Sequence, residues 1–66
     1  MYSTREAARW LTTTGRPTTP NDIRQALHRA RKARAKGRPG RISEPFMVAG
    51  RALWSEAQLN QWRPER

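Results

Sequence analysis

Apolar residues recur at helical spacing near the start of this 66-residue chain. Ser3 and Glu6 are placed as the N-cap and N3 residues of a capping box, which opens a short helix. Residues 12–17 then bring together β-branched residues, a glycine and a proline, which do not continue an α-helix. The pattern therefore predicts a short supporting helix whose apolar residues are Ala7, Ala8, Trp10 and Leu11.

The next periodic segment runs from Pro20 to about Gly37. Thr19 suits the N-cap position, and Asp22 suits the third position of the helix. At about 100° per residue, one face of this helix is apolar and the opposite face is polar. Two helices joined by a tight turn form a helix-turn-helix unit. The apolar face holds Ile23, Ala26, Leu27 and Ala30, and the polar face holds Asn21, Arg24, Gln25, His28, Arg31 and Lys32.

A β-hairpin is predicted after this second helix. Glycine and proline mark residues 37–44 as a loop. Residues 45–48 and 51–54 are short apolar runs on either side of Ala49-Gly50, and this spacing is typical of two strands joined by a two-residue turn. The side chain of Arg51 is therefore expected beside the tip of the hairpin.

A third helix follows, because Ser55 and Gln58 form a further capping box. This helix places Leu59 and Trp62 on one face, and Pro64 ends it. The expected fold class is mostly α with a small β-hairpin. At about 1.5–3 kcal/mol for each large side chain that is buried, the core offsets the chain entropy only narrowly, so we expect marginal stability. The predicted core is Trp10, Leu11, Ile23, Leu27, Phe46, Val48, Leu53, Trp54, Leu59 and Trp62.

The composition excludes several classes of function. Residues 1–66 make a single small domain, near the lower limit at which a core alone stabilises a fold. The sequence has no Cys and one His, so neither a disulfide framework nor a zinc site with the usual ligands can be built. No apolar run approaches the roughly 20 residues of a membrane span, and the first residues lack a signal-peptide pattern. We therefore expect a soluble, cytoplasmic protein without a metal or another cofactor.

The acidic residues give no sign of catalysis. The five carboxylates are scattered, and those of Glu6, Asp22 and Glu56 are placed for capping helices. The other two supply neither an acid–base pair nor an activated nucleophile. The sequence therefore predicts a binding protein and not an enzyme.

The net charge of +9 arises from 14 Lys and Arg residues against 5 acidic ones. Such a field attracts polyanions, with nucleic acid as the first candidate and an anionic membrane or an acidic protein as the others. Twelve of the cations are Arg, which binds guanine and phosphate through paired hydrogen bonds, although a GC-rich genome produces the same bias. A membrane-active helix needs bulky apolar residues opposite its cations, whereas residues 29–36 offer only Ala.

The polar face of the second helix carries the residue types that recognise DNA. Arg, Gln and Asn match guanine and adenine edges in the major groove, and the flanking cations suit phosphates. Residues 36–41 contain Gly-Arg-Pro and resemble the core of AT-hook peptides. This segment would enter a narrow minor groove, contact phosphates or form a flexible solvated loop. Core packing explains the three Trp residues better than base stacking does. The predicted DNA-binding residues are Asn21, Arg24, Gln25, His28, Arg29, Arg31, Lys32, Arg38, Arg41 and Arg51.

Four segments, in this order, resemble the winged-helix excisionases, also called recombination directionality factors, of phages with tyrosine integrases. They are the Met1-Tyr2 start, Arg16-Pro17, residues 22–25 (Asp-Ile-Arg-Gln) and residues 48–56, which run from Val-Ala-Gly-Arg to Trp-Ser-Glu. Together they span most of residues 1–62. MerR-type regulators share the same fold and a similar Gly-Arg wing. The Arg-rich composition points to an actinobacterial phage, such as a mycobacteriophage.

The resemblance implies a winged helix-turn-helix fold (helix, helix, two-stranded wing, helix) in an architectural protein without catalytic activity. Excisionases bind adjacent sites in phage attachment-site DNA cooperatively and head to tail, and they bend it, so that the tyrosine integrase performs excision in the host cytoplasm. Gln25 and His28 stand where the lambdoid pattern has Arg, and residues 36–44 form a longer basic segment. Carried over by position, the contacts of the recognition helix are Asn21, Arg24, Gln25 and His28, and the wing contact is Arg51.

A small MerR-like transcription regulator of a phage or mobile element is the alternative, because it would use the same fold and contacts. Binding at an integrase attachment site favours the excisionase, whereas binding at a promoter operator favours the regulator. An RNA-binding or ribosome-associated protein is a rival of another class. It is disfavoured because no exposed aromatic residues are predicted for stacking on single-stranded RNA.

Overall fold

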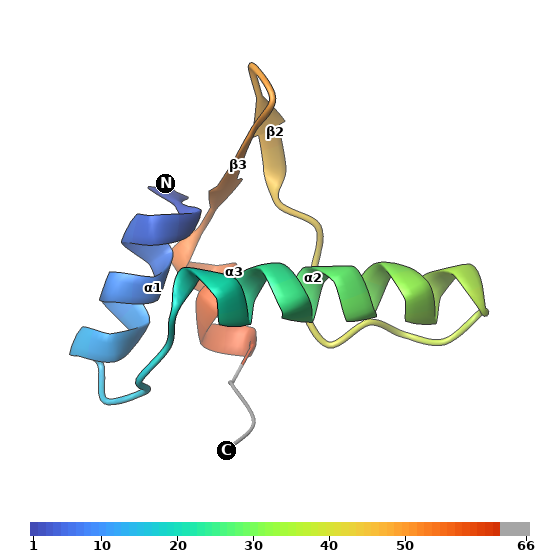
Figure 1. The fold of residues 1–66 in the computed structure, drawn as a ribbon, viewed down its shortest axis with the longest axis horizontal. Coiled ribbons are helices and arrows are strands. Elements are labelled where there is room, and N and C mark those ends of the chain that lie inside the picture. The colour runs from blue at the N-terminus through green and yellow to red at the C-terminus, as the bar shows by residue number, and fades with distance from the viewer. Residues whose placement is uncertain (63–66) are drawn as a thin grey trace.

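The computed structural model describes residues 1–62, which form three helices and one three-stranded antiparallel sheet (Figure 1). About half of the chain is helical, in agreement with the predicted mostly α class and with the order helix, helix, hairpin, helix. The strand order in the sheet is β1-β3-β2. Along the chain the elements are β1 (Tyr2–Ser3), α1 (Thr4–Thr13), α2 (Pro20–Ala35), β2 (Phe46–Val48), β3 (Arg51–Trp54) and α3 (Glu56–Gln61).

Each helix begins at a capping box, at the position that the sequence predicts. The N-cap side chain accepts a hydrogen bond from the backbone N–H three residues later, and the side chain of that residue accepts one from the N-cap N–H. In α1, the hydrogen bond from the Ser3 N–H lowers the pKa of the Glu6 carboxyl below its ordinary value. α3 ends at Gln61, and Pro64 lies outside the described residues. The three pairs are Ser3–Glu6, Thr19–Asp22 and Ser55–Gln58.

Threonine side chains hold the turn between α1 and α2. Gly15 follows α1 with a φ of 90°, a left-handed conformation that suits glycine. The Thr12 hydroxyl accepts a hydrogen bond from the Thr18 N–H at 3.1 Å, and the buried Thr18 hydroxyl donates to the Arg16 carbonyl at 2.7 Å. Because these bonds satisfy the polar groups of the buried Thr18, the turn between α1 and α2 has a defined geometry.

A third strand adds to the predicted hairpin. β1 pairs with β3, with Tyr2 opposite Trp54 and Ser3 opposite Leu53. The Tyr2 hydroxyl donates to Glu56 Oε1 at 2.7 Å, and this hydrogen bond raises the pKa of Tyr2. The sequence does not predict β1, because two residues are too few to show the alternation of a strand.

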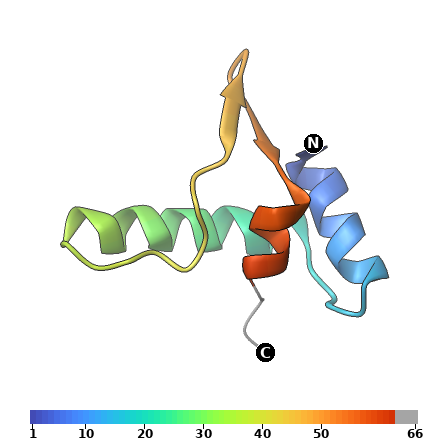
Figure 2. The same cartoon turned by 180° about the vertical axis from the view of Figure 1, so that it is seen from behind.

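The β2–β3 hairpin has the predicted two-residue turn. Ala49 and Gly50 both have positive φ, 50° and 77°, as a type I′ turn requires. Val48 pairs with Arg51 next to this turn. The hairpin projects beyond the helices, and its tip points away from α2 (Figures 1 and 2). Arg51 therefore lies beside the tip, as the sequence predicts.

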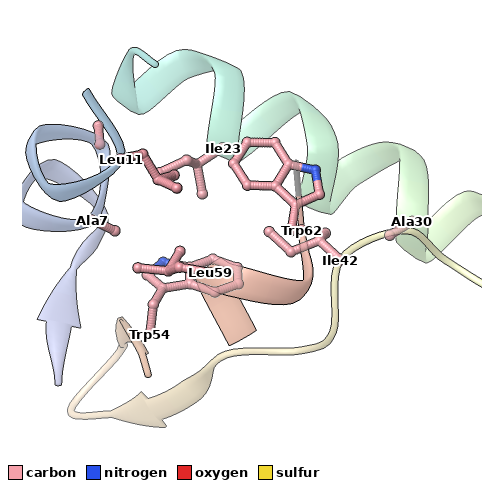
Figure 3. Close-up of a cluster of buried hydrophobic side chains, with 9 residues drawn as sticks. Ala7, Leu11, Ile23, Ala30, Ile42, Trp54, Leu59 and Trp62 are labelled. Atoms are coloured by element: carbon pink, nitrogen blue, oxygen red, sulfur yellow. The ribbon is translucent and has the colours of Figure 1, made fainter. Parts of the chain in front are cut away.

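The core lies between α1, α2, β3 and α3 (Figure 3). Trp10 and Leu27 are partly buried and pack against it, and Leu53 is half-buried. The core positions expected from the sequence are thus largely confirmed. The predicted residues that are buried here are Leu11, Ile23, Trp54, Leu59 and Trp62.

The prediction that Phe46 and Val48 belong to the core is wrong. Their exposed fractions are 58% and 55%, because β2 is the edge strand of a hairpin that projects away from the helices. Ile42, which the sequence places in a loop, is buried instead and lies beside Trp62 in Figure 3. Small side chains complete the core, namely Ala7, Ala8 and Ala30.

Candidate nucleic-acid interface

One face of α2 is exposed along the length of the helix. Ile23 and Ala30 are buried on the opposite face. α3 lies on one side of α2, behind it in Figure 1 and in front of it in Figure 2, so the other side of α2 faces outward. We call this side the outer face. It brings together most of the sequence-predicted stripe, and its exposed residues are Asn21, Arg24, Gln25, His28, Arg29 and Lys32.

The outer face has the chemistry of a surface that recognises nucleic acid. Among the described residues 20–35, no carboxylate lies on it; Asp22 is at the first turn, where its side chain accepts a hydrogen bond from the Thr19 N–H at 2.9 Å. Arg supplies donors, whereas Gln and His supply both donors and acceptors, as base edges require. An open hollow of about 390 Å³ on this face is lined by Arg24, Gln25, His28 and Arg29.

The basic segment 36–44 begins as part of the helix end. Gly37, with a φ of 79°, and Arg38 complete a Schellman motif. In this motif the Arg38 N–H donates to the Ala33 carbonyl at 2.8 Å, and the Gly37 N–H donates to the Arg34 carbonyl at 3.0 Å. The Gly-Arg-Pro sequence is therefore not a free extended arm. This geometry suits a phosphate contact by Arg38 better than insertion into a minor groove.

The same segment then returns along α2 (Figures 1 and 2). A Cβ atom on Gly40 would lie 2.8 Å from the Cβ of Ala30, so this close approach requires glycine. Ile42 is buried, and its carbonyl accepts a hydrogen bond from Arg34 Nη2. The segment is thus packed against the C-terminal half of α2, and it carries Arg38 and Arg41 as exposed residues of that packed structure.

Arg31 lies at the edge of the outer face and forms an ion pair with Glu44. Its Nε atom donates to Glu44 Oε1 at 2.9 Å, and Arg34 Nη1 lies 3.8 Å from Glu44 Oε2. The helical periodicity of the sequence places Arg31 on the polar face of the second helix and does not single out Arg34 or Glu44. No local signal could have found this cluster, because Glu44 is 13 residues from Arg31 in a segment without regular structure.

The β2–β3 hairpin carries one cationic residue, Arg51, away from the outer face. Arg51 is exposed beside the Ala49-Gly50 turn, and the described residues 45–54 contain no carboxylate. β2 also exposes three apolar side chains in succession, Phe46, Met47 and Val48. Arg51 is therefore displayed at the end of an arm that stands apart from the helices (Figure 1).

Residues 1–62 contain neither a metal-ligating cluster nor a membrane-spanning helix. Within residues 1–62, no group of three His, Cys, Asp or Glu side chains is placed to hold a metal ion. In the same range, no helix has the length and apolar character needed to cross a membrane. Comparisons with protein families, curated proteins and solved structures found no match.

Replacing both Arg38 and Arg41 with Gln is expected to weaken binding to any duplex DNA, because phosphate contacts carry no sequence information. The slope of log K against log salt should flatten by up to about 2, since each phosphate contact contributes about 0.9. Fluorescence anisotropy over a salt series measures this slope. Arg5→Gln combined with Arg9→Gln removes the same charge from α1 and should flatten the slope less. A loss of affinity only for duplexes with A·T-rich flanks would indicate that the segment enters the minor groove instead.

Proposed function

We propose that this chain is a winged helix-turn-helix protein that binds double-stranded DNA, with α2 as the recognition helix and the β2–β3 hairpin as the wing. The observation that carries the proposal is the outer face of α2, which is exposed, cationic and, in the described residues, without a carboxylate. An α-helix fits the major groove, and Arg, Gln and Asn side chains match base edges there. Arg51 at the hairpin tip would contact the adjacent backbone or groove.

Within this class we propose an excisionase, a recombination directionality factor that binds the attachment-site arm of a phage genome and directs a tyrosine integrase toward excision. The support is the resemblance in residues 1–62, together with a helix pair that is followed by a Gly-Arg hairpin. Its role would be architectural, since it would bend the DNA and perform no catalysis. It would act in the cytoplasm of the bacterial host.

We expect a monomer in free solution and cooperative loading of several copies on attachment-site DNA. A chain of 66 residues covers a short length of duplex, so a long bend needs repeated copies that make head-to-tail contacts. At a net charge of +9 the copies repel one another, and DNA relieves that repulsion. Sedimentation at low micromolar concentration and titration of an attachment-site duplex measure the two states. A stable closed dimer, or independent loading of single copies, would contradict the excisionase.

A footprint on the genome that encodes the chain tests the proposed function directly. Protection of adjacent sites beside an integrase attachment core supports the excisionase. Protection of a promoter operator supports the MerR-like regulator. Binding to RNA that a duplex-DNA competitor does not displace would overturn DNA binding itself.

A further inference from the structure

Glu44 lies where α2, α3 and the base of the hairpin meet. Its carboxylate accepts a hydrogen bond from Arg31 Nε of α2 at 2.9 Å, and its backbone carbonyl accepts one from Gln58 Nε2 of α3 at 2.7 Å. β2 begins two residues later, at Phe46. The backbone of Glu44 is therefore held by α3, and its charge is directed at the helix that carries the outer face.

The carboxylate contributes little to holding the fold. The side chains of Arg31 and Glu44 are 52% and 51% exposed, and an ion pair with this exposure adds little to stability. Other groups anchor the segment, since Ile42 is buried and Gly40 packs against α2. The consequence of the ion pair lies instead in the charges that α2 offers to a ligand.

A carboxylate at this position changes what Arg31 can bind. Arg31 lies beside the outer face, where a free guanidinium would attract the phosphate of any DNA sequence. With Glu44 present, a phosphate must displace a carboxylate that is already bound, and it also meets the repulsion of that carboxylate. Base contacts by Arg24 and Gln25 on the outer face involve no such competition, because neither residue contacts Glu44 in the described structure.

We propose that Glu44 is a specificity-determining residue, which occupies Arg31, with Arg34 alongside, and thereby suppresses sequence-independent binding by α2. The inference rests on the proposed DNA-binding function. It assigns a role to an acidic residue in a strongly basic protein, where the carboxylate weakens binding to DNA in general and so increases the discrimination between sequences.

The test compares two probes, a random duplex of about 30 base pairs and a duplex that the wild-type protein selects from a randomised library. Glu44→Gln should raise affinity for the random duplex about three- to tenfold and steepen the slope of log K against log salt by about 0.9 to 1.8, the equivalent of one or two phosphate contacts. Affinity for the selected duplex should change less. The ratio of the two affinities therefore falls.

The matched control is Glu56→Gln, which adds the same charge at α3 and should raise both affinities together, leaving the ratio unchanged. In an Arg31→Gln background, Glu44→Gln should lose most of its effect on the random duplex. A persistent effect in that background would overturn the inference. So would an unchanged ratio in a Glu44→Gln variant that still unfolds cooperatively.

A second variant covers the case in which Glu44→Gln does not fold. Glu44→Asp keeps the charge but withdraws the carboxylate from Arg31 by one methylene, so it should raise affinity for the random duplex by a smaller factor. No rise would contradict the role of Glu44. Failure of the wild-type protein to bind either duplex would count against the proposed function, whereas normal wild-type binding with no response to either variant counts against Glu44 alone.

Discussion

Ile42→Ala is expected to lower the free energy of unfolding by about 2–5 kcal/mol, which is a large part of the stability of so small a domain. Ile42 is 1% exposed and belongs to the core cluster, although it lies in a segment without regular secondary structure (Figure 3). Truncation would leave a cavity between α2 and Trp62 and loosen the packed segment 36–44. Urea unfolding, monitored by Trp fluorescence, measures the decrease in the free energy of unfolding.

Phe46→Ala is the matched comparison, because it deletes a larger apolar side chain from a position that is 58% exposed. We expect this substitution to change the free energy of unfolding by less than about 0.5 kcal/mol. The two variants therefore test the observed core against the one predicted from the sequence. A larger loss for Phe46→Ala than for Ile42→Ala would place the core on the hairpin.

The features that the sequence predicts correctly depend on interactions between residues that are close together in the sequence. A capping box involves a side chain and a backbone N–H three residues apart, so the pair Ser3 and Glu6 can be recognised directly. Gly37 at the end of α2 and Gly50 in the hairpin turn have positive φ, which their residue type favours. Such features set where elements begin and end.

The features that the sequence does not predict depend on which surfaces meet. A single apolar residue in a basic loop has no periodicity, so nothing local marks Ile42 as buried. Phe46 and Val48 belong to an apolar run that is typical of a buried strand, but the described residues supply no helix to cover β2. β1 is equally difficult to predict, because Tyr2 pairs with Trp54, near the other end of the chain.

The candidate site contains both a feature that the sequence predicts and a feature that depends on tertiary contacts. Helical periodicity predicts the outer face of α2, and Arg24, Gln25 and His28 lie together as expected. The same periodicity aligns Arg31 with Arg24, seven residues earlier, so it cannot separate them. The distinction arises from Glu44, which contacts Arg31 through tertiary structure. Sequence therefore predicts the surface that is offered to a ligand, and the fold decides which of its cations are already engaged.

Arg24→Ala and Gln25→Ala are each expected to weaken binding to the duplex that the wild-type protein selects by about 1–3 kcal/mol, and to weaken binding to a random duplex far less. Both side chains are exposed and line the same hollow on the outer face. Arg matches the O6 and N7 acceptors of guanine, and Gln matches the N6 and N7 positions of adenine. Each variant should also discriminate less well at the base pair that it no longer contacts. Competition titrations against single-base-pair variants of the selected duplex measure both effects.

The two substitutions separate base recognition from phosphate contact, because Arg24 is charged and Gln25 is not. Gln25→Ala should leave the slope of log K against log salt unchanged, whereas Arg24→Ala should flatten it by at most about 0.9. Lys32→Ala, toward the other end of the outer face, is the comparison for a phosphate contact. This substitution should lower the affinity for the selected and the random duplex by the same factor. Equal losses on the selected and random duplexes for Gln25→Ala would contradict the docking of α2 in the major groove, since an uncharged side chain at the centre of the outer face contributes to sequence preference only through direct contact with a base.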